Sequence, residues 1–267
     1  MKLFISADIE GCVGTTLASE THKDMPEYRQ FARQMTEEVA AVCEAALEAG
    51  ADEIVVKDGH GDATNIDFTA LPDRVTLIRG KSGHPYNMMF GLDDSFDAVL
   101  YVGYHAPAGN GGNPISHTST GNSNQILLNG KVMSEFMLNT YTAAMIGVPA
   151  VFISGDEAIC SLAREMVPAI TTAAVKKGVG GSTISMSKAA ADRLLRSRVK
   201  EALSRDGAFK LGISMPEKFE YVVNYKDLKK AYQMSFFPGA ERVDERTNRV
   251  VSSNYLDIVT AHSFMVY

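Results

Sequence analysis

Two carboxylates near the start of the chain stand directly after an apolar run. Residues 3–7 are mostly apolar, and Asp8, Ile9, Glu10 and Gly11 follow them. Residues two apart on an extended chain point to the same side, so we expect Asp8 and Glu10 to converge at the end of a strand. Like charges held together are costly unless a cation neutralises them. The pair therefore indicates a metal or catalytic site. A solvated turn, or an Asp that caps a following helix, is the alternative.

Side chains that bind metals also follow two further apolar runs. Asp58 and His60 come after the run 53–57, and His105 follows the run 97–103. In an open parallel sheet the carboxyl ends of the strands share one edge, and ligands bind in the crevice outside it. Imidazole and carboxylate ligands suit Zn²⁺, with Mn²⁺, Co²⁺ or Fe²⁺ as alternatives. A carboxylate shared between two metals about 3.5–4 Å apart would use the whole set.

The elements that position these residues alternate between strands and helices. A helix is expected over 27–48, where apolar residues recur at helical spacing. The Asn129-Gly130 pair predicts a type I′ hairpin within 125–133. The remaining expectations in this half are strands over 53–57, 75–78, 97–103 and 149–154, a short helical stretch at 87–91 and a helix over 134–146. This alternation predicts an α/β fold with a mostly parallel sheet and helices on both faces.

The pattern changes after about residue 165. We expect a Gly-rich linker at 178–182 and a helix over 187–203 with Ser187 as its N-cap. Further expectations are strands over 171–176 and 219–224, a helix over 226–234, a hairpin within 241–254 and a closing helix over 255–267. We therefore predict two domains: a metal-binding catalytic α/β domain over 1–170 and a smaller α+β domain over 171–267.

Composition narrows the class of protein. The chain has 267 residues, of which 45% are hydrophobic and 22% charged, as is usual for soluble globular proteins. A net charge of −6 offers no electrostatic footprint for nucleic acid or for an anionic membrane, so neither is an expected partner. No signal peptide or long apolar segment is visible, and the three cysteines form no disulfide framework. These features predict a cytoplasmic protein.

A phosphate-binding loop is excluded at Gly80-Lys81-Ser82. A Walker A motif needs a glycine five residues before its second glycine, and Val75 occupies that position. The Gly-rich stretch at 178–182 lacks a dinucleotide fingerprint as well.

Several separate motifs, in order, resemble the M55 family of zinc-dependent D-aminopeptidases. The motifs are Asp8-Ile9-Glu10-Gly11, Asp58-Gly59-His60, Gly103-Tyr104-His105-Ala106, Ser116-His117, Gly155-Asp156 and Thr171–Lys176. The resemblance covers about the first 180 residues well and the remainder in outline.

The resemblance implies two zinc ions per subunit. Asp8 would bridge them, Glu10 and His60 would complete one site, and His105 and Glu135 the other. It also implies that His117 is the catalytic residue, as nucleophile or general base, and that the subunits form a ring-like homo-oligomer. The family has glycines flanking the last acid, whereas this chain reads Met133-Ser134-Glu135-Phe136.

The leading hypothesis is therefore a metal-dependent aminopeptidase that removes the N-terminal residue, a D-amino acid, from short peptides. A two-metal phosphoesterase is one alternative, although no basic cluster near the ligands is evident for gripping a phosphate. A non-catalytic, metal-dependent binding or assembly protein is the other. The sequence does not determine the stereochemical preference, because about 1–3 kcal/mol in pocket shape decides it.

Overall fold

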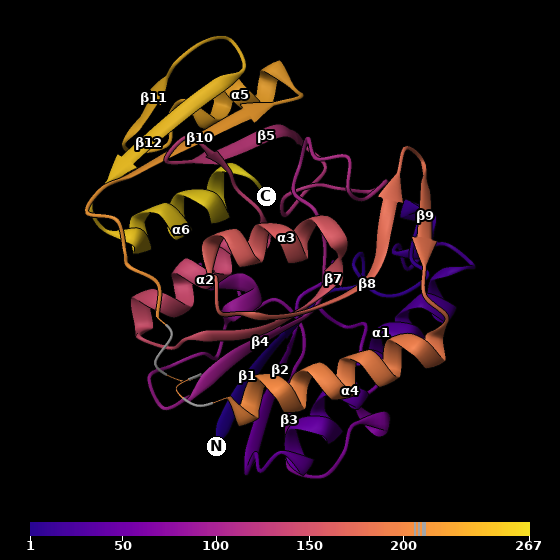
Figure 1. Ribbon diagram of the computed structural model, residues 1–267. Coiled ribbons are helices and arrows are strands. Elements are labelled where there is room, and N and C mark those ends of the chain that lie inside the picture. The colour runs from indigo at the N-terminus through magenta and orange to yellow at the C-terminus, as the bar shows by residue number, and fades with distance from the viewer. Residues whose placement is uncertain (206, 208, 210–211) are drawn as a thin grey trace.

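A seven-stranded sheet forms the centre of the protein (Figure 1). The computed structural model describes residues 1–205, 207, 209 and 212–267. The strand order is β3-β2-β1-β4-β7-β8-β9, and every pair is parallel except β8 with β9. The strands are β1 (Lys2–Ala7), β2 (Glu53–Asp58), β3 (Val75–Ile78), β4 (Ala98–Tyr104), β7 (Ala150–Asp156), β8 (Thr171–Val179) and β9 (Ser182–Ser185). The predicted α/β fold with a mostly parallel sheet is confirmed.

Helices cover both faces of this sheet (Figure 1). On one face lie α1 (Tyr28–Glu48) and α4 (Lys188–Ser204), which share an apolar core with β1 side chains such as Leu3 and Ile5. On the other lie α2 (Glu135–Ile146) and α3 (Glu157–Met166), which pack against Phe4. Ser187 caps α4 as predicted, because its side chain accepts a hydrogen bond from the backbone N–H of Ala190.

A second, antiparallel sheet lies beyond α2 and α6 (Figure 1). Its strand order is β11-β12-β10-β5-β6. The strands are β5 (Ser123–Leu128), β6 (Lys131–Val132), β10 (Phe219–Tyr225), β11 (Ala240–Arg242) and β12 (Thr247–Ser252). The accompanying helices are α5 (Leu228–Met234) and α6 (Tyr255–Met265). Asn129 and Gly130 have φ values of +50° and +76°, which the predicted hairpin turn between β5 and β6 requires.

The two sheets do not divide the chain at residue 170. β8, β9 and α4 extend the large sheet and its helical cover, although they lie beyond that residue. β5 and β6 precede it and belong to the small sheet. The stretch at 178–182, expected to be a linker, is instead the turn region of the β8–β9 hairpin, in which Val179 pairs with Ser182.

Short 3₁₀ helices complete the described chain: η1 (Ala18–Glu20), η2 (Phe68–Ala70) and η3 (Asn87–Met89). Within the described residues, no helix combines the length and apolar composition needed to cross a bilayer.

Candidate metal centre

The centre forms where the strand order of the large sheet reverses, at the carboxyl ends of β1 and β4. β1 pairs with β2 on one side and β4 on the other, so the chain winds outward in both directions from this point. Ligands of open α/β sheets bind in the crevice that such a reversal creates. Asp8 and Glu10 follow β1, and His105 follows β4.

Two glycines allow the ends of β1 and β4 to approach closely. The N–H of Gly11 donates to the carbonyl of Gly103 over 2.8 Å. A Cβ on Gly11 would lie 1.8 Å from the carbonyl oxygen of Tyr104. Gly103 has φ +71°, and a Cβ there would lie 2.2 Å from the carbonyl oxygen of Asp8. Glycine at both positions therefore lets the two carboxylates lie beside His105.

His60 joins the site from the loop after β2. Its Nε2 lies 2.8 Å from the carbonyl oxygen of Thr21, so this nitrogen carries the proton and donates. The free Nδ1 lies 3.0 Å from Glu10 Oε2 and 3.4 Å from Asp8 Oδ1. Asp58 has a different role, because its carboxylate accepts hydrogen bonds from the backbone N–H groups of Asn65 and Ile66 and so shapes the loop.

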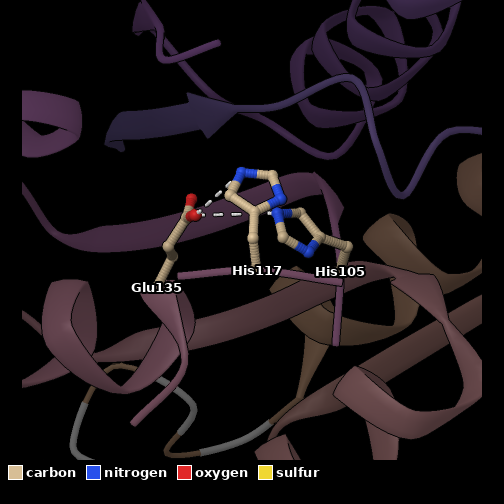
Figure 2. Close-up of side chains that lie close together, drawn as sticks. All are labelled: His105, His117 and Glu135. Carbon is tan, nitrogen blue, oxygen red and sulfur yellow. Dashed lines mark ion pairs between the residues drawn. The ribbon is translucent and has the colours of Figure 1, made fainter. Parts of the chain in front are cut away.

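His105 and Glu135 lie close together (Figure 2), and His105 faces the second Asp8 oxygen. His105 Nδ1 donates to the carbonyl of Ala106 over 2.8 Å, and Nε2 is turned toward the carboxylates. That Nε2 lies 3.6 Å from Asp8 Oδ2 and 3.6 Å from Glu135 Oε1. Ser134 caps α2 by accepting from the N–H of Met137, which places Glu135 in the first helical turn.

His117 lies beside these two residues (Figure 2). Its ring centroid is 4.4 Å from that of His105, and its Nε2 is 3.8 Å from Glu135 Oε1. Its Nδ1 donates to the carbonyl of Ile115 over 2.9 Å. The side chain is 24% exposed, against 2% for His105, so His117 is the histidine that a molecule from solvent can reach.

The donor set suits a divalent cation. Each of the three imidazoles uses one nitrogen on a backbone carbonyl and turns the other toward carboxylates, the arrangement usual for metal-binding histidines. Glu10 Oε2 and His105 Nε2 are buried and have no hydrogen-bond partner among the described residues. Buried polar atoms are rarely left unpaired, and a bound cation would satisfy both. Donor atoms of Asp8, Glu10 and His105 lie within 4.8 Å of one another, as do those of His105, His117 and Glu135.

Comparison with known proteins assigns this chain to a family. The model of the M55 peptidases, described as D-aminopeptidase, matches residues 1–264. The chain belongs to the M55 family. This finding confirms the resemblance that the sequence motifs indicated.

Relatives support the M55 assignment in sequence and in structure. A D-aminopeptidase of Bacillus subtilis is 32% identical over 244 residues, which cover 90% of this chain and 87% of the relative. The solved structure of the zinc-dependent D-aminopeptidase DppA from Bacillus subtilis, described as a self-compartmentalizing protease, is also similar. It superposes with a TM-score of 0.92 at 28% identity, over 100% of this chain and 97% of that one.

The charged groups of the candidate site strongly shift one another's pKa values. Burial raises the pKa of Asp8 to about 8, and the charge of Glu10 adds to the shift. Against the effect of burial, His60 holds the pKa of Glu10 well below its usual range. Likewise, Glu135 raises the pKa of His105 to about 10, and His105 lowers that of Glu135 to about 2. These shifts favour the protonated forms of Asp8, His60 and His105, so binding of a cation at the candidate site would release protons.

Three buried residues that the sequence reasoning did not assign to the site support this M55 centre. Asn113 Nδ2 donates to the carbonyl of Glu10 and to Asp156 Oδ2, over 3.1 Å in each case. The same Asp156 oxygen accepts from the N–H of Ala106, beside His105. Lys176 Nζ donates to the carbonyls of Glu10 and Thr15. The end of β1 is thus tied to the end of β4. The only sequence signal was that Asp156 and Lys176 fall in two of the quoted motifs.

A cavity of about 840 Å³ lies beside α2 and α3. Its lining includes the apolar side chains of Phe136, Met137, Leu162 and Met166, together with polar residues such as Asn110 and Lys131. Neither the five candidate ligands nor His117 lines it.

Proposed function

We propose that the protein is a two-zinc aminopeptidase that removes an N-terminal D-residue from short peptides. The observation that carries this proposal is the convergence of five predicted ligands from four separate segments, with two of their donor atoms buried and unpaired. Family membership favours a peptidase over the phosphoesterase and over the non-catalytic protein. The zinc dependence of the Bacillus subtilis relative supports zinc as the metal.

The ligands divide into two groups around Asp8. One Asp8 oxygen faces His60 and the other faces His105, which supports a bridging role. Glu10 and His60 would hold one ion, and His105 and Glu135 the other. Two ions per subunit would use every donor in the set.

His117 would handle the proton in the proposed reaction. Metal ions in such a site supply Lewis acidity, which polarises the scissile carbonyl and lowers the pKa of water. His117 Nδ1 is held as a donor by the carbonyl of Ile115, so Nε2 is the basic nitrogen and faces the centre. An imidazole exchanges protons near neutral pH, which suits transfer to the leaving amine. As a nucleophile, the same nitrogen would attack the carbonyl directly.

Assembly and location follow the same reasoning. The relative is described as self-compartmentalizing, which supports a ring-like homo-oligomer that encloses the sites. We propose a cytoplasmic enzyme, because its three cysteines are free and buried, as is usual in a reducing compartment.

Metal content tests the ligand assignment. Replacing Asp8 by Ala should cost both zinc ions, whereas Glu10→Ala should cost mainly one. Glu245 is exposed, so Glu245→Ala is the matched control and should keep two zinc ions. Equal loss from both ligand variants would contradict the bridging role.

Turnover tests the reaction. Zinc-loaded protein should hydrolyse free-amine dipeptides from a panel of enantiomeric pairs and prefer the D-form. Bound zinc without hydrolysis of any amide would contradict the proposed function.

A further inference from the structure

Lys81, in the loop after β3, carries a positive charge toward the rim of the metal centre. Its loop is fixed to the segment that bears His60. The carbonyl of Gly80 accepts from the buried ammonium of Lys57 over 2.8 Å, and its N–H donates to the carbonyl of Ala63 over 2.6 Å. The backbone at Lys81 is therefore held in place, while its side chain is partly exposed to solvent and partly covered by neighbouring residues.

The ammonium group of Lys81 lies on an aromatic ring beside the centre. Its Nζ is 4.5 Å from the ring centroid of Tyr267. The hydroxyl of Tyr267 accepts from Asn87 Nδ2, and its carbonyl accepts from Lys230 Nζ over 2.6 Å. Two hydrogen bonds thus hold the residue on whose ring Lys81 rests.

Neighbouring contacts connect this ring to the candidate ligand Glu135 through His262 and Ser119. The ring of Tyr267 lies 6.1 Å from that of His262, centroid to centroid. His262 Nε2 bonds to the hydroxyl of Ser119, and the N–H of Ser119 donates to Glu135 Oε1 over 2.7 Å. A short chain of contacts thus leads from Lys81 to a candidate ligand.

The charge on Lys81 is not neutralised by an ion pair. No carboxylate among the described residues lies within 4 Å of its Nζ. Asp62, an acid outside the centre whose charge also acts on Lys81, is paired with Lys23 at 2.7 Å. Burial lowers the pKa of Lys81, and the charges of Glu135 and Asp8 oppose that shift, so the cation and the ligand cluster are within electrostatic reach. Such an unpaired cation can bind an anion on an incoming molecule.

We propose that Lys81 binds the C-terminal carboxylate of the substrate, so that the enzyme selects free dipeptides and tripeptides. This inference rests on the proposed function. With the N-terminal amine and scissile carbonyl at the metals, the next charge along a short peptide is its carboxylate. In an extended dipeptide this group lies about 7 Å from the amine. Buried Lys57 adds positive potential behind Lys81.

The test compares D-alanylglycine with D-alanylglycinamide, which differ only in the terminal charge. Zinc-loaded wild-type enzyme should favour the acid by about tenfold or more in kcat/KM, the size of a charge-assisted contact. Lys81→Met should abolish this preference by raising KM for the acid. The KM for the amide and the kcat for both substrates should stay unchanged. Lys81→Arg should keep part of the preference, because it keeps the charge. Exposed Lys229, replaced by Met, is the control and should behave as wild type.

Binding gives a readout that does not depend on turnover. In the His117→Ala background, calorimetry should show D-alanylglycine binding about tenfold more weakly after Lys81→Met. Equal use of acid and amide by the wild type, or an equal loss on both substrates in Lys81→Met, would overturn the inference. A fall in kcat on both substrates would place Lys81 in the chemistry instead. Absence of hydrolysis of every D-aminoacyl substrate would refute the proposed function itself.

Discussion

Replacing Gly103 by Ala should separate the ends of β1 and β4 and so dismantle the metal centre. The new Cβ would lie 2.2 Å from the carbonyl oxygen of Asp8 and 2.7 Å from Cys12 Sγ. A tolerable carbon–oxygen contact of about 3.3 Å requires the two strand ends to move apart by about 1 Å. Asp8 would move with its carbonyl, away from His105.

The structure gives the expected magnitude. A left-handed φ of +71° costs an alanine about 1–2 kcal/mol. The clash adds about 1–3 kcal/mol, as in overpacked cores. We therefore expect the free energy of unfolding to fall by about 2–5 kcal/mol, and a shift of about 1 Å at the centre to lower kcat/KM by about 100-fold.

Gly130→Ala is the matched control. Gly130 has a similar φ of +76°, but a Cβ there would meet no atom within 4 Å. Its free energy of unfolding should fall by only about 1–2 kcal/mol, because of backbone strain, and the variant should keep its zinc. Urea denaturation of the metal-free proteins and zinc retention against a chelator would measure the two effects. If Gly103→Ala matched Gly130→Ala in both assays, the close approach would not be what positions Asp8.

Three further outcomes follow from the structure. His117→Ala should abolish hydrolysis of dipeptides while both metals stay bound, as metal analysis of the purified variant would show; retained turnover would contradict its role. Lys176→Met should lower the free energy of unfolding by about 1–3 kcal/mol, because the buried carbonyl of Thr15 loses its donor, whereas exposed Lys177→Met should not. Burial lowers the pKa of His262 to about 4, so its contribution to stability is complete above about pH 6.5 and is lost as the pH falls toward 4. The stability of the wild type relative to His262→Gln should thus fall by about 1.4 kcal/mol per pH unit between pH 6 and 4.5 in urea titrations; a constant difference would contradict the shift.

Strand ends made four of the six candidate site residues predictable from the sequence. Asp8, Glu10, His60 and His105 each follow a buried strand, and parallel strands deliver their carboxyl ends to one edge. Glu135 and His117 follow no such strand. Glu135 begins a helix, and His117 lies in a loop, so only the family resemblance singled them out.

Long-range pairing explains what could not be predicted. The local pattern revealed the β5–β6 hairpin, but its partner β10 lies far along the chain, and no local signal names that partner. The change of pattern after residue 165 suggested a domain boundary, yet β8 pairs with β7 of the large sheet. Helix α3 was missed because it is short and buries only Ile159, Cys160 and Ala163.

The path of the chain between His105 and Glu135 has a consequence for biosynthesis. After β4 the chain leaves the large sheet, contributes β5 and β6 to the small sheet, and returns as α2 with Glu135 at its start. β5 lies between β6 and β10, and β10 is synthesised almost a hundred residues after β5. A nascent chain therefore carries Asp8, Glu10 and His60 on a sheet that can fold early. The segment with His117 and Glu135 cannot complete its sheet until β10 has been synthesised. Peptide hydrolysis would therefore begin only after β10 has left the ribosome and paired with β5.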